Sequence, residues 1–111
     1  MAENDSHARV VLTTAANADE ANRLAHSLVE ERLVACATLI PSVRSIYRWE
    51  GEIEESNEIL LVLKTGVDQL AALQLRLHAL HSYDTPEFLV LAVESGSPAY
   101  LGWLQNGLRR V

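Results

Sequence analysis

The sequence predicts an α+β domain in which one antiparallel sheet is covered by helices. Three observations lead to this prediction. Short runs rich in β-branched residues alternate with segments of helical periodicity in the order strand, helix, strand, strand, helix, strand, with one more helix at the end. The length of 111 residues is that of one domain. The composition, 49% hydrophobic and 22% charged, is that of a globular protein. We therefore expect a single domain over residues 8–111, preceded by a flexible polar tail at residues 1–7.

The first strand and the first helix are predicted from local signals. Residues 8–14 form a short β-branched run that ends in polar residues, which is typical of a strand. Asn17 is a suitable helix cap, and Glu20 stands three residues later, as in a capping box. The apolar residues that follow recur at helical spacing and predict a helix that ends near residue 31.

A hairpin with two long arms is predicted next. Residues 33–47 are rich in strand-forming residues, but Pro41 interrupts them. Because proline has no amide hydrogen to donate, Pro41 must lie at an edge, a bulge or a bend. Gly51 is the one glycine in this region and marks the turn, after which residues 52–65 return as a second strand.

The second half of the chain repeats the pattern. Leucines at positions 70, 73, 77 and 80 fall on one face of a predicted helix over residues 68–80. After a loop, the apolar run within residues 86–94 predicts a fourth strand that is buried on both faces. Ser97 and Pro98 then form a typical helix start. The element order is that of the ferredoxin-like βαββαβ fold with an extra C-terminal helix.

Composition excludes several classes of function. The net charge of −6 argues against binding to a nucleic-acid backbone, which depends on clustered lysine and arginine. A single cysteine, Cys36, can form neither an internal disulfide nor a paired-thiolate metal site. The sequence contains no apolar run long enough to span a membrane and no secretory signal, so we expect a cytoplasmic protein without membrane contact.

Three segments of the sequence resemble a known family. They are ACATLIPSVRSIYRWEGEIEES, EILLVLKT and HSYDTPEFLVLAVESGSPAYLGWL, and the similarity to the CutA family of divalent-cation tolerance proteins spans residues 9–108. The resemblance implies a compact homotrimer in which the long hairpin strands pair with neighbouring subunits, an architecture similar to that of the PII signalling trimers. It also implies a role in tolerance to divalent cations, with copper the favoured metal, no organic cofactor and no established catalytic reaction.

The sequence departs from the family pattern at two positions. The loop that commonly reads HPYE in relatives is HSYD here, so the proline is replaced and the acidic residue is shorter. Thr13 stands where some relatives carry a cysteine, which removes one thiolate from any metal site.

The predicted metal ligands are His81, Asp84 and Cys36. Neutral imidazole suits copper and zinc, and Asp84 follows His81 by three residues in a loop that could turn both side chains inward. A histidine at the end of a helix can instead hydrogen-bond backbone carbonyls, and a cysteine in an apolar strand is commonly a small buried hydrophobe. Glu50, Glu52 and Glu54 alternate along one strand face and are expected to be solvated or salt-bridged rather than to hold a cation.

A second set of residues predicts a contact or a ligand cleft between subunits. Tyr47 and Trp49 alternate along a strand and therefore share a face, which another subunit would bury. In a PII-like assembly Lys64, Tyr83 and Glu87 could line a cleft. The alternative function is then a signalling or scaffolding module that binds a small molecule or a protein in this cleft. Tyr100 and Trp103 on the last helix are expected to pack on the sheet or on a neighbour.

Overall fold

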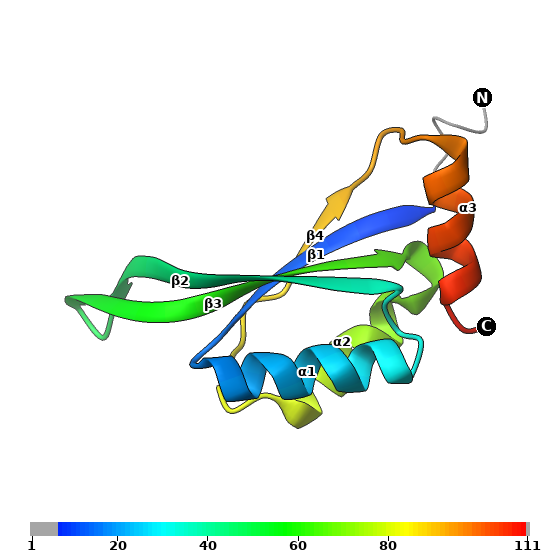
Figure 1. The fold of residues 1–111 in the computed structure, drawn as a ribbon. Helices are drawn as coiled ribbons and strands as arrows, with labels where there is room; N and C mark the ends of the chain where they lie inside the picture. The colour runs from blue at the N-terminus through cyan, green and yellow to red at the C-terminus, as the bar shows by residue number, and fades with distance from the viewer. Residues whose placement is uncertain (1–6, 111) are drawn as a thin grey trace.

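The computed structural model describes residues 7–110 (Figure 1). The predicted tail at residues 1–7 lies outside the described residues except for His7, whose backbone carbonyl accepts a hydrogen bond from the Val67 amide at 2.8 Å. The strands are β1 (Ala8–Ala15), β2 (Cys36–Trp49), β3 (Glu52–Gly66) and β4 (Leu89–Ala92). The helices are α1 (Ala18–Glu30), the 3-10 turn η2 (Val67–Gln69), α2 (Leu70–Leu80) and α3 (Pro98–Gly107).

The four strands form one sheet in the order β2-β3-β1-β4, with all neighbours antiparallel. This confirms the predicted α+β class and the order of elements. The two helices α1 and α2 lie together on one face of the sheet, while α3 stands at the end where the described chain begins and ends (Figure 1). Among residues 7–110, no helix combines the length and the apolar character needed to cross a bilayer.

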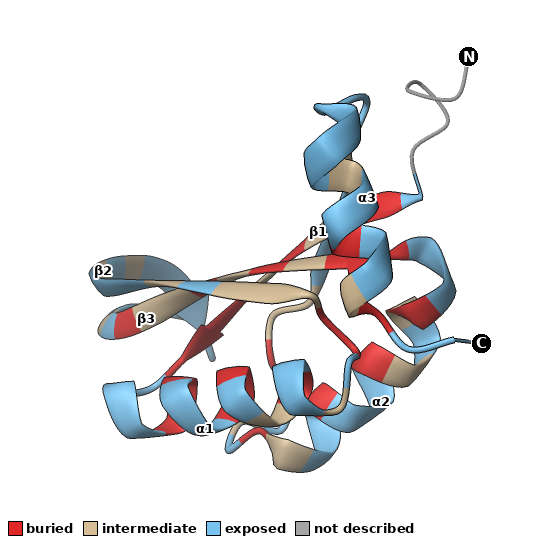
Figure 2. Ribbon diagram, turned by 45° about the vertical axis from the view of Figure 1, so that its right-hand side comes forward, coloured by how far each residue is buried: buried red, intermediate tan, exposed pale blue. Residues whose placement is uncertain are grey.

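The core lies between the sheet and the two helices that cover it. Leucines of α1, α2 and β3 meet there, as their spacing in the sequence predicts, and the buried colour in Figure 2 follows the inner sides of these elements. The largest side chains that are almost completely buried are Leu24, Leu28, Leu33, Leu61, Leu63, Leu73 and Leu77. A second, smaller cluster of Ala8, Leu104 and Leu108 attaches α3 to the start of β1.

The predicted hairpin is present, with its irregularities at the expected places. The register of β2 against β3 shifts between Ile40 and Val43, next to Pro41, and Ser42 adopts a φ of 61°. Proline thus lies at a bulge, where no ladder hydrogen bond is required of it. The turn consists of Glu50 and Gly51, with φ values of 50° and 83°. Two positive φ values in a two-residue turn match the right-handed twist of the flanking strands.

Both predicted helix caps are confirmed. The Asn17 side chain accepts a hydrogen bond from the Glu20 amide at 2.9 Å, and the Ser97 hydroxyl accepts one from the Tyr100 amide at 3.2 Å. Glu20, however, does not return to the amide of Asn17 as in a standard capping box. Its carboxylate accepts a hydrogen bond from the Ala16 amide instead, at 3.1 Å, one residue earlier.

The prediction that the fourth strand is buried on both faces is wrong for a single chain. All four residues of β4 are exposed, and the strand forms one edge of the sheet beside β1. The apolar run predicts that the strand is buried. It does not show whether the residues that bury it belong to the same chain or to another one. Tyr100 and Trp103 show the same feature, since their rings pack against each other, with centroids 5.4 Å apart, and remain about half exposed.

Candidate functional site

The loop that follows α2 contains His81, the predicted leading ligand. Its ring is buried, and its Nε2 lies 2.7 Å from the carbonyl oxygen of Thr14 at the end of β1. Its Nδ1 lies 3.0 Å from the amide of Tyr83. Because an amide can only donate, Nδ1 accepts this hydrogen bond, and Nε2 carries the proton that is donated to Thr14. Both ring nitrogens of His81 are therefore engaged in hydrogen bonds with backbone groups.

The Glu20 carboxylate is the second anchor of this loop. It is 3% exposed, and it accepts hydrogen bonds from the amide of Ala16 and, at 2.7 Å, from the amide of Ser82. Its Oε2 also lies 3.6 Å from Nδ1 of His81. Burial would raise the pKa of the Glu20 carboxyl, but the backbone hydrogen bonds outweigh burial and hold this pKa below its usual value. The carboxylate is thus ionised at neutral pH and ties α1 to the loop.

Tyr83 connects the loop to the hairpin by hydrogen bonds. Its hydroxyl donates to Oε2 of Glu58 at 2.8 Å, and the Ser45 hydroxyl donates to the other oxygen, Oε1, at 2.6 Å. Glu58 is only 8% exposed, so its carboxylate is shared between two hydroxyl groups from different elements. Burial and the neighbouring Glu58 carboxylate raise the pKa of the Tyr83 phenol far above its ordinary value. The phenol is therefore a hydrogen-bond donor across the physiological range.

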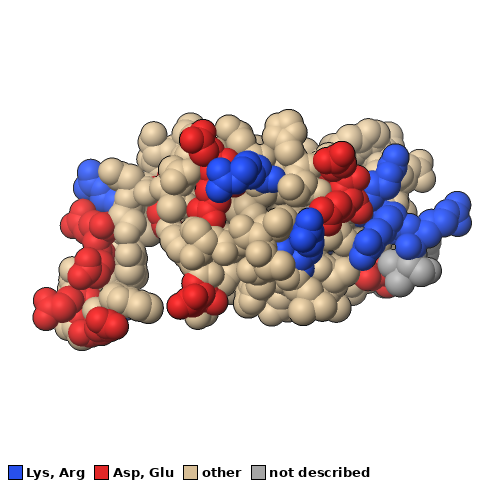
Figure 3. Space-filling view, turned by 90° about the horizontal axis from the view of Figure 1, so that it is seen from below, with Lys and Arg blue, Asp and Glu red and all other residues tan. Residues whose placement is uncertain are grey.

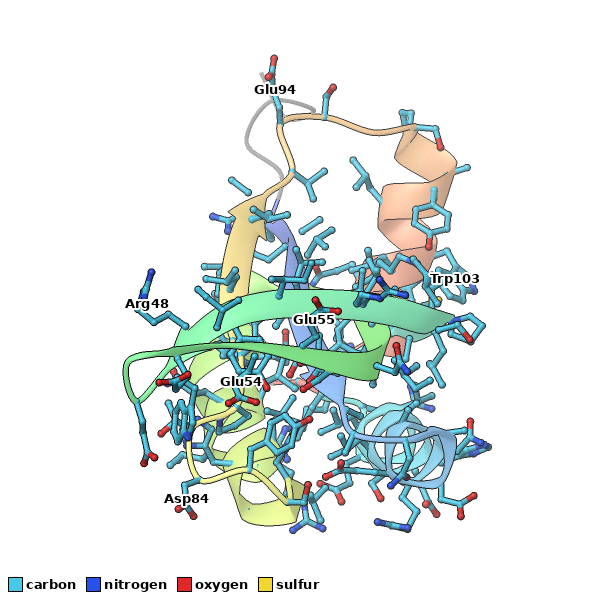
Figure 4. The ribbon with its side chains drawn as sticks, turned by 90° about the vertical axis from the view of Figure 1, so that its left-hand side faces the viewer. Arg48, Glu54, Glu55, Asp84, Glu94 and Trp103 are labelled. Atoms are coloured by element: carbon cyan, nitrogen blue, oxygen red, sulfur yellow. The ribbon has the colours of Figure 1, made fainter. Side chains whose placement is uncertain are left out.

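The other two predicted metal ligands lie apart from His81. Cys36 begins β2 opposite Lys64, with its Sγ 3.8 Å from the lysine Nζ. Lys64 in turn pairs with Val10 of β1, whereas His81 contacts Thr14, four residues further along the same strand. Four residues span about 13 Å of a strand, so Cys36 and His81 lie at different positions along the sheet. Asp84 is exposed, and Figure 4 shows it on the outer side of the loop. Within residues 7–110 no three histidine, cysteine, aspartate or glutamate side chains are placed to hold a metal ion.

One chain therefore does not bring the three predicted ligands together. His81 could coordinate a metal only if one of its two ring hydrogen bonds opened. The assignment of His81, Asp84 and Cys36 as ligands stays a prediction.

The residues predicted to line a cleft are also divided between two places. Tyr47 and Trp49 are exposed on one face of the hairpin, and the Tyr47 hydroxyl lies 2.7 Å from the Ser56 hydroxyl. Lys64 contacts Thr38 and lies six residues from Glu58 along β3, about 20 Å away. Lys64 and Tyr83 therefore do not share a cleft within one chain. Glu87 is half-buried in the segment before β4.

Glu20, Glu58 and Ser45 were not predicted as site residues. The sequence indicates only a helix-capping role for Glu20, and it shows Glu58 only as the last member of the acidic run in the hairpin. A signal for Glu58 does exist, because it immediately precedes the apolar run of residues 59–63 and lies where the sheet core begins. No local pattern indicates that Tyr83, 25 residues later, would reach it.

Charge is distributed unevenly over the molecule. In the view of Figure 3 acidic side chains gather at one end, while arginines and lysines lie mainly toward the other. The exposed glutamates at positions 50, 52, 54 and 55 belong to the hairpin, and the exposed Arg109 and Arg110 follow α3. The hairpin is therefore the acidic end of the described chain.

Residues 9–107 match the family described as CutA1 divalent ion tolerance protein. This match covers nearly the whole chain. The protein belongs to the CutA1 family. The divalent-cation tolerance protein CutA of Pectobacterium atrosepticum is 47% identical over 100 residues, which cover 90% of this chain and 91% of the relative.

Solved CutA1 structures agree with the fold. The divalent cation tolerance protein of Thermus thermophilus superimposes with a TM-score of 0.90 at 41% identity, covering 92% of this chain and 99% of that one. CutA1 from Oryza sativa gives a TM-score of 0.92 at 38% identity, covering 94% and 95%. The resemblance found in the sequence is thus confirmed, and the four-stranded antiparallel sheet with its helices is the CutA1 fold.

Proposed function

We propose that this protein acts in divalent-cation tolerance as a homotrimer that has no catalytic reaction of its own. The supporting observation is the apolar surface that one chain leaves uncovered. Ile46, Trp49 and Ile53 on the hairpin are each at least 60% exposed, and Leu89, Val90 and Leu91 of β4 are exposed as well. Ile46 and Ile53 share one face of the hairpin, Trp49 lies on the other face, and the three β4 residues form a separate exposed run at the far edge of the sheet. Exposed apolar patches of this kind mark interaction surfaces.

The backbone supports the same proposal. Strands β2 and β4 form the two edges of the sheet, so each presents amide and carbonyl groups to which another chain can bind. An apolar edge strand that stays uncovered would promote aggregation, whereas pairing in a closed assembly satisfies both the hydrogen bonds and the side chains. We expect sedimentation equilibrium to give about three times the protomer mass of 12.3 kDa. A species of 12.3 kDa at micromolar concentration would contradict the assembly.

The cargo in this proposal is a divalent metal, with copper preferred because imidazole and thiolate are borderline to soft ligands. His81 and Asp84 are the leading ligands, and Cys36, beside the Lys64 ammonium group, is a separate candidate. Coordination by His81 requires that its ring release Thr14 or Tyr83. We therefore expect weaker binding than at a preformed metal site.

The test is calorimetric titration of Cu²⁺ and Zn²⁺ into wild-type protein and two variants. His81→Gln removes the imidazole but retains a side-chain N–H donor, and His78→Ala is the control because His78 is exposed in the last turn of α2, three residues before His81. Loss of a true ligand costs at least the 10–100-fold typical of an outer-shell partner. We expect that loss only in His81→Gln. Equal binding by the wild type and His81→Gln would exclude His81 as a ligand.

The second candidate function is a PII-like signalling or scaffolding module whose cleft between subunits binds a small molecule or a protein. It is favoured by the polar cluster of Tyr83, Glu58 and Ser45, which lies at the foot of the hairpin that carries the exposed Tyr47. Thermal-shift screening separates the two functions, because a ligand of the folded state raises the melting temperature in proportion to its occupancy. A metabolite that raises it when divalent metals do not would favour this second function.

A further inference from the structure

The outer part of the hairpin, residues 43–58, extends beyond the sheet and is called the arm here. Pairing between β1 and β3 ends at Ala15 and Ile59, so the arm consists of two strands only (Figure 1). An isolated two-stranded ribbon is marginally stable and twists easily. The register shift between Ile40 and Val43 lies at the foot of the arm and provides a point at which it can bend. Within one chain, the arm therefore needs a further contact to fix its direction.

The loop of residues 81–84 is well placed to supply that restraint, because it is itself fixed to the body of the protein. His81 binds the Thr14 carbonyl of β1, and the Ser82 amide binds the Glu20 carboxylate of α1. Tyr83 follows directly, and its backbone amide binds the His81 ring. The hydrogen bonds of the loop to β1 and α1 therefore fix the position of the Tyr83 backbone, from which the phenol extends.

We propose that the hydrogen bond from Tyr83 to Glu58 is a latch that fixes the direction of the arm relative to the body. Glu58 belongs to β3, and its second carboxylate oxygen accepts the hydroxyl hydrogen of Ser45 on β2. One carboxylate therefore holds both strands of the arm to the loop. Among the contacts of the described residues, this one joins the loop to the arm through a buried charged group, whereas the ion pair of Arg44 with Glu55 is exposed and lies within the arm.

The energetics favour this latch over the other polar contacts of the arm. A hydrogen bond to an ionised group is about twice as strong as one between neutral groups. Glu58 is almost completely buried, so water cannot freely replace the Tyr83 hydroxyl when it is removed. By contrast, the hydrogen bond between Tyr47 and Ser56 is neutral and exposed, and water can replace it.

Release of the latch would change the direction in which the arm meets a neighbouring subunit. This consequence rests on the proposed function, in which the arm carries surface for pairing with neighbouring subunits. A metal or a small molecule that displaces residues 81–84 would release Tyr83 from Glu58 and free the arm to bend.

The test is hydrogen exchange measured by mass spectrometry on the assembled protein, with Tyr83→Phe compared with the matched control Tyr47→Phe. Both variants lose one phenolic hydroxyl near the arm, but only Tyr83→Phe breaks the link to the body. From the strength of a hydrogen bond to a charged group, we expect amide exchange in residues 43–58 to accelerate about tenfold to a hundredfold in Tyr83→Phe. Exchange in α1 and β1 should be unchanged, and Tyr47→Phe should match the wild type.

Glu58→Gln provides a second route to the same contact. It should accelerate exchange in the arm, and its combination with Tyr83→Phe should give less than the product of the two effects, because both remove the same interaction. Unchanged exchange in the arm, equal effects of the two tyrosine variants, or acceleration throughout the molecule would each overturn the latch. Sedimentation of the wild type separates the proposals, because a monomeric wild type contradicts the assembly while the comparison of exchange rates still tests the latch.

Discussion

Strands β2 and β3 pass through two regions that are stabilised in different ways. In the body, Leu61 and Leu63 of β3 are completely buried under α1 and α2. In the arm, Ile46 and Ile53 on the same pair of strands are 62% and 61% exposed. The backbone ladder is continuous through both regions apart from the shift near Pro41. The comparison shows that the same strands bury their side chains only where the chain supplies a second layer.

The two regions therefore depend on different partners. The body is held by packing among elements of one chain, which is the dominant source of stability in a small domain. The arm has its ladder, the Glu58 contact and exposed apolar side chains that the described chain does not cover. It follows that substitutions in the body should change folding, whereas substitutions on the arm should change association.

The largest expected effect is a loss of stability when a buried leucine of α2 is truncated, compared with truncation of an exposed leucine of the same helix. Leu77→Ala empties a site of zero exposure between α2 and the sheet, whereas Leu75 is 75% exposed. We expect Leu77→Ala to lower the free energy of unfolding by about 2–5 kcal/mol. Leu75→Ala should change it by no more than about 0.5 kcal/mol. Urea denaturation at one protomer concentration measures both, and equal effects would contradict the assigned core.

A smaller effect is expected for Trp49→Ala, and it should appear in association. Because Trp49 is 60% exposed, its removal should leave protomer packing intact while it removes an aromatic contact from the proposed interface. Such anchors contribute about 2 kcal/mol or more to binding. Sedimentation velocity across a dilution series should show the variant dissociating at higher concentration than the wild type. Leu75→Ala is the control. If the wild type and both variants dissociate at the same concentration, Trp49 does not contribute to the interface.

The smallest effect concerns Glu20, where the body holds the loop that leads to the arm. The pKa of its carboxyl is lowered by folding from the ordinary value of 4.5, so the ionised form is stabilised in the folded state. Its contribution is complete above the unfolded pKa and is lost as the pH falls through the lower folded pKa. We expect Glu20→Gln to cost about 1.5 kcal/mol at neutral pH, the low end for hydrogen bonds to a charged group.

This cost should disappear in acid. In urea denaturation from about pH 7 down to about pH 3, the difference between the wild type and Glu20→Gln should shrink once the pH falls below the unfolded pKa. A difference that stays constant over this range would show that the Glu20 charge does not stabilise the loop.

Much of the fold could be predicted because its signals are local. Asn17 and Ser97 cap their helices where the sequence places them, and Gly51 lies in the turn with a positive φ. Pro41 lies beside the bulge because a residue without an amide hydrogen leaves few other positions in a strand. These features depend on neighbours within a few residues, so a pattern in the sequence is sufficient to find them.

The candidate site was predicted less completely because its contacts join distant segments. His81 was identified as important, but its ring binds Thr14, 67 residues earlier, and no spacing rule indicates that pairing. Glu58 and the neighbouring hairpin glutamates look alike in the sequence. Only the approach of Tyr83 and Ser45 distinguishes the buried carboxylate from the solvated ones.

By itself the sequence determined the family, the order of strands and helices, the caps and turns, and the helix faces that form the core. These follow from periodicity, backbone propensity and motif, which are properties of short segments. The tertiary structure decided which apolar runs are buried within the chain, and it leaves β4 and the arm exposed. It also decided which polar groups are hydrogen-bonded to other parts of the chain. Those outcomes depend on what lies opposite each side chain in space, and pairings between residues far apart in the chain settle that.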